Sequence, residues 1–318
     1  MVDGRGATAD LLRGLRRAAS AASENAVAVG YVSGWRLVRL LPEPVARWLF
    51  ARVGERIHRR NGNGVRRLRG NLARVRPAAG EEDLERLTRE AVQSYLRYWC
   101  ESFRLPSWPI DDVVRRTRTI NEELLREAFA RGNGVVVALP HMANWDWAGA
   151  WACATGMPLS TVAERLKPER LYDEFVAYRG SLGMEILGAG DASTFPRLMR
   201  TVATGGFVCL LGDRDLSRSG IEVMLCGERA RMPRGPAELA RRTGAPLIPA
   251  TLAYVGDDLE IAFHPAVPHA TGDDGLAAMM QGVADAFTEG IRAHPEDWHM
   301  MQKVFVADLS GPADPVRG

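Results

Sequence analysis

Short apolar runs alternate with amphipathic segments along the chain from residue 121 onward. Runs of this length, bounded by turn residues, predict strands that are buried on both faces of a sheet. They cover residues 134–140, 160–166, 184–188, 206–213, 221–227, 245–255 and 259–267. The segments between several of them predict helices, at residues 168–182, 192–204 and 233–243. We therefore expect an α/β fold with one mostly parallel sheet covered by helices on both faces, its last two strands joined as a hairpin through Gly-Asp-Asp at 256–258.

The amino-terminal part has a helical period instead. Residues 82–104 predict one helix, and residues 35–60 predict two helices separated by Pro42 and Pro44. Within 35–60, apolar residues recur at helical spacing while arginines occupy other faces: Trp35, Val38, Leu41, Val45, Leu49 and Val53. This pattern is typical of amphipathic helices, both of those lying in a membrane interface and of those packed on their own domain, and it does not choose between the two.

The chain contains no internal repeat and no long linker. The simplest organisation is a basic extension over residues 1–25, one domain over 26–310 and a tail over 311–318. Within the domain, 26–110 is mostly helical and 121–305 forms the α/β core. A membrane-spanning helix needs about 20 apolar residues, and the run at 26–32 is too short, so we expect a soluble or peripheral protein.

Charge is distributed unevenly. The formal net charge of the whole chain is only +2, but residues 1–76 contain sixteen arginines and five acids, so the rest of the chain is acidic. A basic amino-terminal part favours contact with an anionic membrane surface, a phosphorylated ligand or nucleic acid. Nucleic acid is the weakest of these, because no nucleic-acid-binding motif accompanies the charge.

Cysteine and histidine patterns argue against disulfides and metals. Four widely spaced cysteines without a CxxC motif are typical of reduced core residues in a cytosolic compartment. The pairs His264/His269 and His294/His299 lack zinc-like spacing with supporting carboxylates. We expect neither a metal nor another cofactor.

The segment LPHMANWDWAG (139–149) places polar side chains directly behind a predicted strand. Ligands of open α/β sheets bind at the carboxyl ends of strands, and His141 lies at such an end. If His141 is in the loop and Asp146 in the first helical turn, the carboxylate can orient the imidazole as a general base. The alternative interpretation is a structural loop histidine, with Asn144 or Asp146 capping the helix.

These residues also carry a family resemblance. HMANWD (141–146) matches the HxxxxD signature, in its H-x-x-N-W-D form, of the bacterial lipid A biosynthesis acyltransferase family. Further matches follow in order, at TVAERLKPERLYDEFVAYRGSLG (161–183), LGDRDLSRSGIEVMLCGERARMPRGPAELARRTGAPLIP (211–249) and HPEDWHMMQ (294–302), with GYVSGWRLVRLLPE near the start. Over residues 28 to 310 or so, the chain strongly resembles the actinobacterial phosphatidylinositol mannoside acyltransferases of this family.

The resemblance implies an acyl-CoA-dependent O-acyltransferase at the cytoplasmic face of the plasma membrane. The implied reaction moves a long acyl chain to the 6-hydroxyl of the mannose at inositol position 2 of a phosphatidylinositol mannoside. His141 is the implied base, Asp146 its orienter, and no covalent acyl-enzyme is required. Other acceptors, such as a lipid A precursor or a lysophospholipid, remain open, and so does a non-catalytic lipid-binding relative.

The resemblance also assigns substrate contacts, each with a structural alternative. Glu164 and Arg179 match groove residues, although a surface ion pair is the ordinary interpretation of both. His299 matches a position near the sugar, where a core or capping histidine is the alternative. Ser219 and Arg242 match donor-contacting positions, and an arginine at 242 departs from the residue type expected there.

Asp213 is the clearest departure from the family pattern. The family usually has Glu before Arg-Asp-Leu, and that carboxylate helps to organise the acceptor or the catalytic histidine. Asp is one methylene shorter, so its contact is expected to need a water molecule or a shifted backbone.

Overall fold

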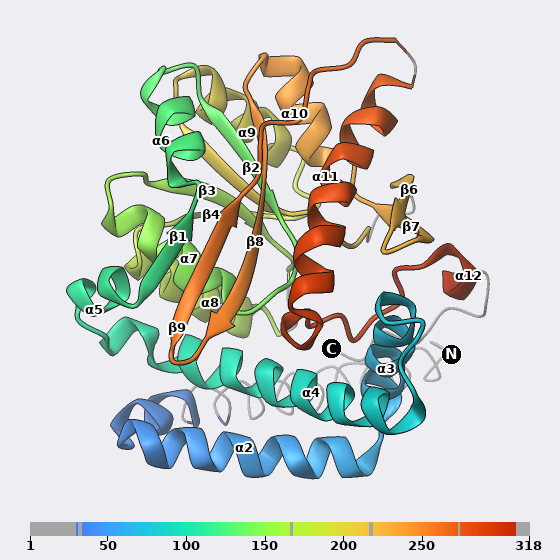
Figure 1. Cartoon of the computed structure of the whole chain (residues 1–318). Coiled ribbons are helices and arrows are strands. Elements are labelled where there is room, and N and C mark those ends of the chain that lie inside the picture. The colour runs from blue at the N-terminus through green and yellow to red at the C-terminus, as the bar shows by residue number, and fades with distance from the viewer. Residues whose placement is uncertain (1–29, 31–33, 166–167, 216–218, 273, 310–318) are drawn as a thin grey trace, which may run out of the picture.

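A seven-stranded sheet forms the centre of the computed structural model, which describes residues 30, 34–165, 168–215, 219–272 and 274–309 (Figure 1). The predicted extension at 1–25 and the tail at 311–318 lie outside the described residues. The strand order is β1-β9-β8-β2-β5-β3-β4. The strands are β1 (Thr117–Ile120), β2 (Val135–Leu139), β3 (Leu159–Ala163), β4 (Glu185–Gly188), β5 (Phe207–Leu211), β8 (Leu247–Val255) and β9 (Asp258–Phe263). The predicted α/β fold class is confirmed.

The sheet is mostly parallel. β2 pairs in parallel with both β5 and β8, and β3 pairs in parallel with β4 and β5. β8 and β9 form the predicted antiparallel hairpin, in which Val255 pairs with Asp258. Gly256 supplies the positive φ of 62° that this tight turn needs.

Two strands were not predicted, and one predicted strand lies elsewhere. β1 is a short edge strand with the sequence Thr-Arg-Thr-Ile, which has too few apolar residues to be recognised. The run at 221–227 leaves the central sheet: β6 (Ile221–Leu225) pairs with β7 (Glu228–Met232) as a separate antiparallel hairpin. Three of the five residues of β7 are charged, so its sequence carries no apolar run. Cys226 and Gly227 turn the chain with φ values of 53° and 86°.

Helices cover both faces of the sheet, as predicted (Figure 1). α6 and α7 pack on one face, and α9, α10 and α11 pack on the other. The helices of the α/β region are α5 (Ile110–Arg115), α6 (Glu122–Ala130), α7 (Trp145–Ala154), α8 (Glu169–Ser181), α9 (Thr194–Ala203), α10 (Gly235–Thr243), α11 (Gly275–Ala293) and α12 (Val306–Leu309), with 3₁₀ turns η1 (Leu105–Ser107) and η2 (Pro295–Asp297). All five residues of β2 are buried, and the four cysteines are unpaired and at least partly buried.

The amino-terminal helices lie across the carboxyl edge of the sheet. Residues 34–40 are helical, and α2 (Glu43–Arg60), α3 (Asn63–Val75) and α4 (Glu81–Arg104) follow. α4 runs below the end of β8, and α2 packs along the outer side of α4 (Figure 1). The predicted break is confirmed at Pro42, which precedes α2, whereas Pro44 fits inside the first turn of that helix.

The apolar face predicted over residues 35–60 divides in two. Trp35 and Val38 are buried, whereas Val45, Leu49 and Val53 of α2 are exposed. α2 instead packs on α4 through its opposite face, where Ala46 and Gly54 are buried. Within the described residues, no helix is both long enough and apolar enough to cross a bilayer.

Candidate active site

His141 and Asp213 form a hydrogen-bonded pair at the carboxyl edge of the sheet. The imidazole Nδ1 lies 2.6 Å from Asp213 Oδ1, and the backbone N–H of His141 donates to Asp213 Oδ2 at 2.9 Å. β2 and β5 are neighbours with Leu139 opposite Leu211, so each member of the pair lies two residues beyond the end of its strand. The fold therefore brings the two side chains to the same height of the sheet.

Asp213 is buried and ionised. Burial alone would raise its pKa, but the neighbouring His141 and the hydrogen bonds from His141 and Trp298 lower the pKa below its ordinary value. The indole Nε1 of Trp298 donates to Asp213 Oδ2 at 2.9 Å. A carboxylate at Nδ1 holds the proton on that nitrogen and leaves Nε2 with a lone pair. The direct contact also shows that Asp213 reaches the ring without a bridging water molecule.

Asp146 lies in the first turn of α7, as expected, but its carboxylate bonds to residues other than His141. Its Oδ1 accepts from Arg179 Nε at 2.6 Å, and its Oδ2 accepts from the Tyr98 hydroxyl at 3.1 Å. The expectation that Asp146 orients His141 is therefore wrong in this structure. Asn144 caps α7, and Asp146 in the turn that follows bonds to Arg179 of α8 and Tyr98 of α4. The capping alternative thus holds for Asn144, while the carboxylate beside the ring is Asp213.

Arg179 is held tightly by this ion pair. Burial would lower its pKa, but the charge of Asp146 outweighs that effect and raises the pKa above its ordinary value. The guanidinium is therefore a fixed positive charge beside the pocket that contains His141.

His141 opens into a pocket of about 430 Å³. Two of the predicted substrate residues, Glu164 and Arg179, also line it. Its wall includes a stacked aromatic pair, Tyr98 and Trp145, whose ring centroids lie 4.0 Å apart. The pocket therefore combines a histidine, carboxylates, guanidinium groups and an aromatic surface.

Several residues of this pocket were not predicted from the sequence. Arg214, Asp215 and Arg234 line the pocket, and Arg214 lies 3.5 Å from Glu164. The Arg-Asp pair directly follows Asp213, so its position beside a predicted strand end was an available signal. Tyr98 carried no such signal, because it comes from α4, far away in the sequence.

Three predicted substrate residues lie outside the lining of this pocket. Ser219 is exposed in the segment before β6. Arg242 lies on α10, paired with Glu238 and stacked over the Phe195 ring at 5.3 Å. His299 is buried behind the aromatic wall, 6.2 Å from Trp145 between ring centroids.

Apolar space continues from the pocket toward the core. A cavity of about 40 Å³ shares Trp145, Val162 and Leu211 with the pocket. A second cavity of about 30 Å³ adjoins it between α7 and the sheet, and both are lined by Gly149 and Cys209. Together they mark a recess that begins beside Trp145, called here the apolar recess, whose charged lining residues are Asp146 and Arg179.

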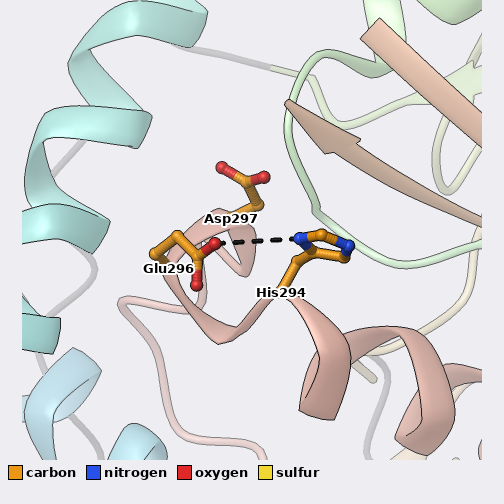
Figure 2. Close-up of side chains that lie close together, drawn as sticks. All are labelled: His294, Glu296 and Asp297. Carbon is orange, nitrogen blue, oxygen red and sulfur yellow. Dashed lines mark ion pairs between the residues drawn. The ribbon is translucent and has the colours of Figure 1, made fainter. Parts of the chain in front are cut away.

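One other cluster has a composition that a metal could use. Ligand atoms of His294, Glu296 and Asp297 lie within 4.8 Å of one another, and Figure 2 shows His294 facing Glu296 while the Asp297 carboxylate points away. Both Asp297 oxygens already accept hydrogen bonds, from the Ser94 hydroxyl at 2.6 Å and the Tyr254 backbone N–H at 2.7 Å. These contacts explain Asp297 as part of a hydrogen-bond network rather than as a metal ligand.

Comparison with known proteins connects this geometry to a family. The model of the bacterial lipid A biosynthesis acyltransferases matches residues 19–306. A Mycolicibacterium smegmatis protein named phosphatidylinositol mannoside acyltransferase is 44% identical over 286 residues, which cover 89% of this chain and 92% of that protein. Proteins of the same name from two Mycobacterium tuberculosis strains are each 42% identical over 295 residues, 92% of both chains.

Proposed function

The chain belongs to the bacterial lipid A biosynthesis acyltransferase family, and from this premise we propose that it acylates phosphatidylinositol mannosides. The donor in this proposal is a long-chain acyl-CoA, and the acceptor is the 6-hydroxyl of the mannose at inositol position 2. The names of three relatives at 42% to 44% identity support the acceptor class. The observation that carries the chemistry is the His141–Asp213 pair, whose imidazole lines the pocket.

In the proposed reaction, His141 acts as the general base. Its Nε2 takes the proton of the mannose hydroxyl while the hydroxyl oxygen attacks the thioester carbonyl carbon. Asp213 holds the ring in place, and its negative charge stabilises the imidazolium that forms. Collapse of the tetrahedral intermediate forms the ester and breaks the C–S bond, and the departing thiolate takes the proton from His141. Because a thioester is already activated, the reaction requires neither a metal nor an acyl-enzyme.

The pocket offers matching contacts for both substrates. Arg179, Arg214 and Arg234 line it with positive charge, which suits CoA phosphates and the developing oxyanion. Glu164 and Asp215 provide acceptors for sugar hydroxyls. The apolar recess beside Trp145 gives the acyl chain a point of entry toward the core in our proposal.

We further propose a peripheral position at the cytoplasmic face of the plasma membrane. α2 exposes an apolar stripe, defined here as Val45, Trp48, Leu49 and Val53, whose side chains are 40% to 58% exposed. Arg52 of the same helix lies over the Trp48 ring at 5.5 Å. Apolar and aromatic side chains among arginines favour the interface of an anionic membrane.

The deciding experiment incubates the protein with radiolabelled palmitoyl-CoA and a panel of acceptors. The panel contains phosphatidylinositol mannosides, a lipid A precursor and a lysophospholipid, and products are identified by mass spectrometry. We expect label in the mannoside ester, and a loss of at least about 1,000-fold in kcat for His141→Ala. Transfer only to another panel member would overturn the acceptor, and near wild-type transfer by His141→Ala would overturn the mechanism. Acceptor binding without any transfer would instead support the non-catalytic alternative.

A further inference from the structure

The segment 297–299 holds both members of the catalytic pair. The backbone N–H of His299 donates to the carbonyl oxygen of His141 at 2.8 Å, and the Trp298 indole donates to Asp213 at 2.9 Å. Trp298 is completely buried, so its indole has little freedom to move. The position of the base and of its carboxylate therefore depends on where this segment lies.

The same segment fixes the loop that carries the base. The backbone N–H of Ala143 donates to the carbonyl oxygen of Asp297 at 2.9 Å. Ala143 has a φ of 42°, which is a left-handed conformation that costs energy for a residue with a Cβ. Surrounding contacts must maintain such a conformation, and the bond to Asp297 is one of them.

Ser94 of α4 connects the two side chains on either side of Trp298. Its hydroxyl lies 2.6 Å from Asp297 Oδ1 and 2.9 Å from His299 Nε2. All three side chains are buried, which strengthens these bonds relative to the same bonds in water. One hydroxyl thereby ties the segment 297–299 to α4.

The hydrogen-bond chemistry defines the tautomer of His299. A serine hydroxyl has one proton, and the carboxylate oxygen at 2.6 Å accepts it. The serine oxygen must then accept from His299, which places the imidazole proton on Nε2. Burial, with a smaller contribution from His141, lowers the pKa of His299 to about 3, so the ring stays neutral. Its Nδ1 has no hydrogen-bond partner among the described residues.

We propose that Ser94 is a positioning residue for the His141–Asp213 pair and acts through Asp297 and His299. Its hydroxyl sets the His299 tautomer and anchors the segment that carries Trp298, and Trp298 in turn holds Asp213. The kinetic consequence rests on the proposed acyl transfer, whereas the tautomer is a property of the free protein. Neither Ser94 nor its position on α4 belongs to the HxxxxD signature.

The kinetic test compares Ser94→Ala with Ser94→Thr. Ser94 also lines a cavity of about 350 Å³ between α2, α4 and Asp297, so the added methyl group of threonine has space. We expect Ser94→Ala to lower kcat on the order of 10-fold to 100-fold with KM changed less than about twofold, because a displaced base affects chemistry rather than binding. Ser94→Thr keeps the hydroxyl and should recover most of the rate. A rise in KM with unchanged kcat for Ser94→Ala would overturn the proposal. So would a kcat in Ser94→Thr as low as that in Ser94→Ala.

Thr88→Val is the matched control. Thr88 has a buried hydroxyl on the same helix, and it donates to the Leu84 carbonyl within α4. The control should lose comparable thermal stability without the loss in kcat. An equal fall in kcat for Ser94→Ala and Thr88→Val would show that Ser94 acts only through the stability of the fold.

The tautomer is measured by ¹⁵N NMR of histidine-labelled protein, with the His299 signals assigned by their loss in His299→Gln. We expect a single neutral tautomer protonated at Nε2 in the wild type, and a mixture in Ser94→Ala. A wild-type ring protonated at Nδ1 would overturn the proposal even if Ser94→Ala did not fold. This measurement needs no substrate, so failure of the proposed acyl transfer would leave it interpretable.

Discussion

Asp213 receives hydrogen bonds from three donors, the ring and backbone of His141 and the indole of Trp298. A buried acid remains ionised only when its surroundings compensate for the lost solvation, and these three donors do so. The result is a fixed negative charge against Nδ1, on the side of the ring opposite the nitrogen that accepts the substrate proton. Such an arrangement stabilises the imidazolium that forms during proton transfer without further reorganisation.

Replacing Asp213 by Asn should therefore be severe. The amide nitrogen can donate to Nδ1, which favours the tautomer with its proton on Nε2 and removes the base. We expect kcat to fall about 1,000-fold to 10,000-fold, with the fold retained. Steady-state kinetics and thermal unfolding measure the two effects. Asp146→Asn is the comparison, because Asp146 bonds Arg179 and Tyr98 instead of the ring. A larger loss of kcat in Asp146→Asn than in Asp213→Asn would show that Asp213 is not the residue that orients His141.

From the sequence, Asp146 was the expected orienter of His141, and the family resemblance left open whether the carboxylate at 213 organises the acceptor or the histidine. His141 and Asp146 share one motif, so proximity along the chain favoured Asp146 as the orienter. Asp213 follows a different strand, 72 residues from His141. Which strands become neighbours is decided by packing of the whole sheet, and β5 lies beside β2 although β3 and β4 come between them in sequence.

At the scale of elements, strands with continuous apolar runs were predictable, and strands with charged residues were not. β2 and β5 are buried within the sheet, and their runs are unmistakable. β1 at the sheet edge and β7 in the small hairpin need no apolar run, because one face or edge meets solvent. The exposed apolar face of α2 shows what helical spacing cannot predict. Helical spacing predicts an apolar face, but it does not say which face meets the protein.

α7 also forms one wall of the apolar recess. Gly149 lines both small cavities, and a Cβ built there would lie 2.5 Å from Met184 Sδ. Glycine at this position thus leaves room for Met184, which lines the cavity beside Trp145 where an acyl chain passes in our proposal. A larger side chain at this position must push Met184 into that cavity and so reduce its space.

Gly149→Leu should shorten the preferred acyl chain. We expect the ratio of kcat/KM for palmitoyl-CoA to that for decanoyl-CoA to fall at least about tenfold, since removing space for a few methylenes costs 1 kcal/mol or more. A series of acyl-CoA lengths measures this ratio. Gly70→Leu on α3 is the control, because a Cβ at Gly70 meets no atom within 4 Å. An unchanged ratio in Gly149→Leu would place the acyl chain outside the recess.

Across the whole molecule, the charge asymmetry coincides with the position of α2. The arginine-rich first 76 residues include this helix, and α2 lies on the outer side of α4, below the carboxyl edge of the sheet (Figure 1). The pocket begins at the same edge, with Tyr98 of α4 in its wall. A membrane bound to the exposed stripe of α2 would therefore lie on the same side of the sheet as the pocket, which suits a lipid acceptor.

Trp48→Ser combined with Leu49→Ser tests this arrangement. Burying these two side chains in a membrane interface contributes a few kcal/mol, so we expect binding to vesicles containing anionic phospholipid to weaken about 10-fold to 100-fold. Co-sedimentation over a salt series measures the binding, and added salt should weaken what remains, because exposed charges are screened. Met224→Ser is the matched control, since Met224 is exposed to a similar degree on β6, away from α2. Activity on an acceptor dispersed in detergent should persist in both variants, because neither change touches the pocket. Wild-type binding by the double variant, or equal weakening by Met224→Ser, would show that the membrane contact is made elsewhere.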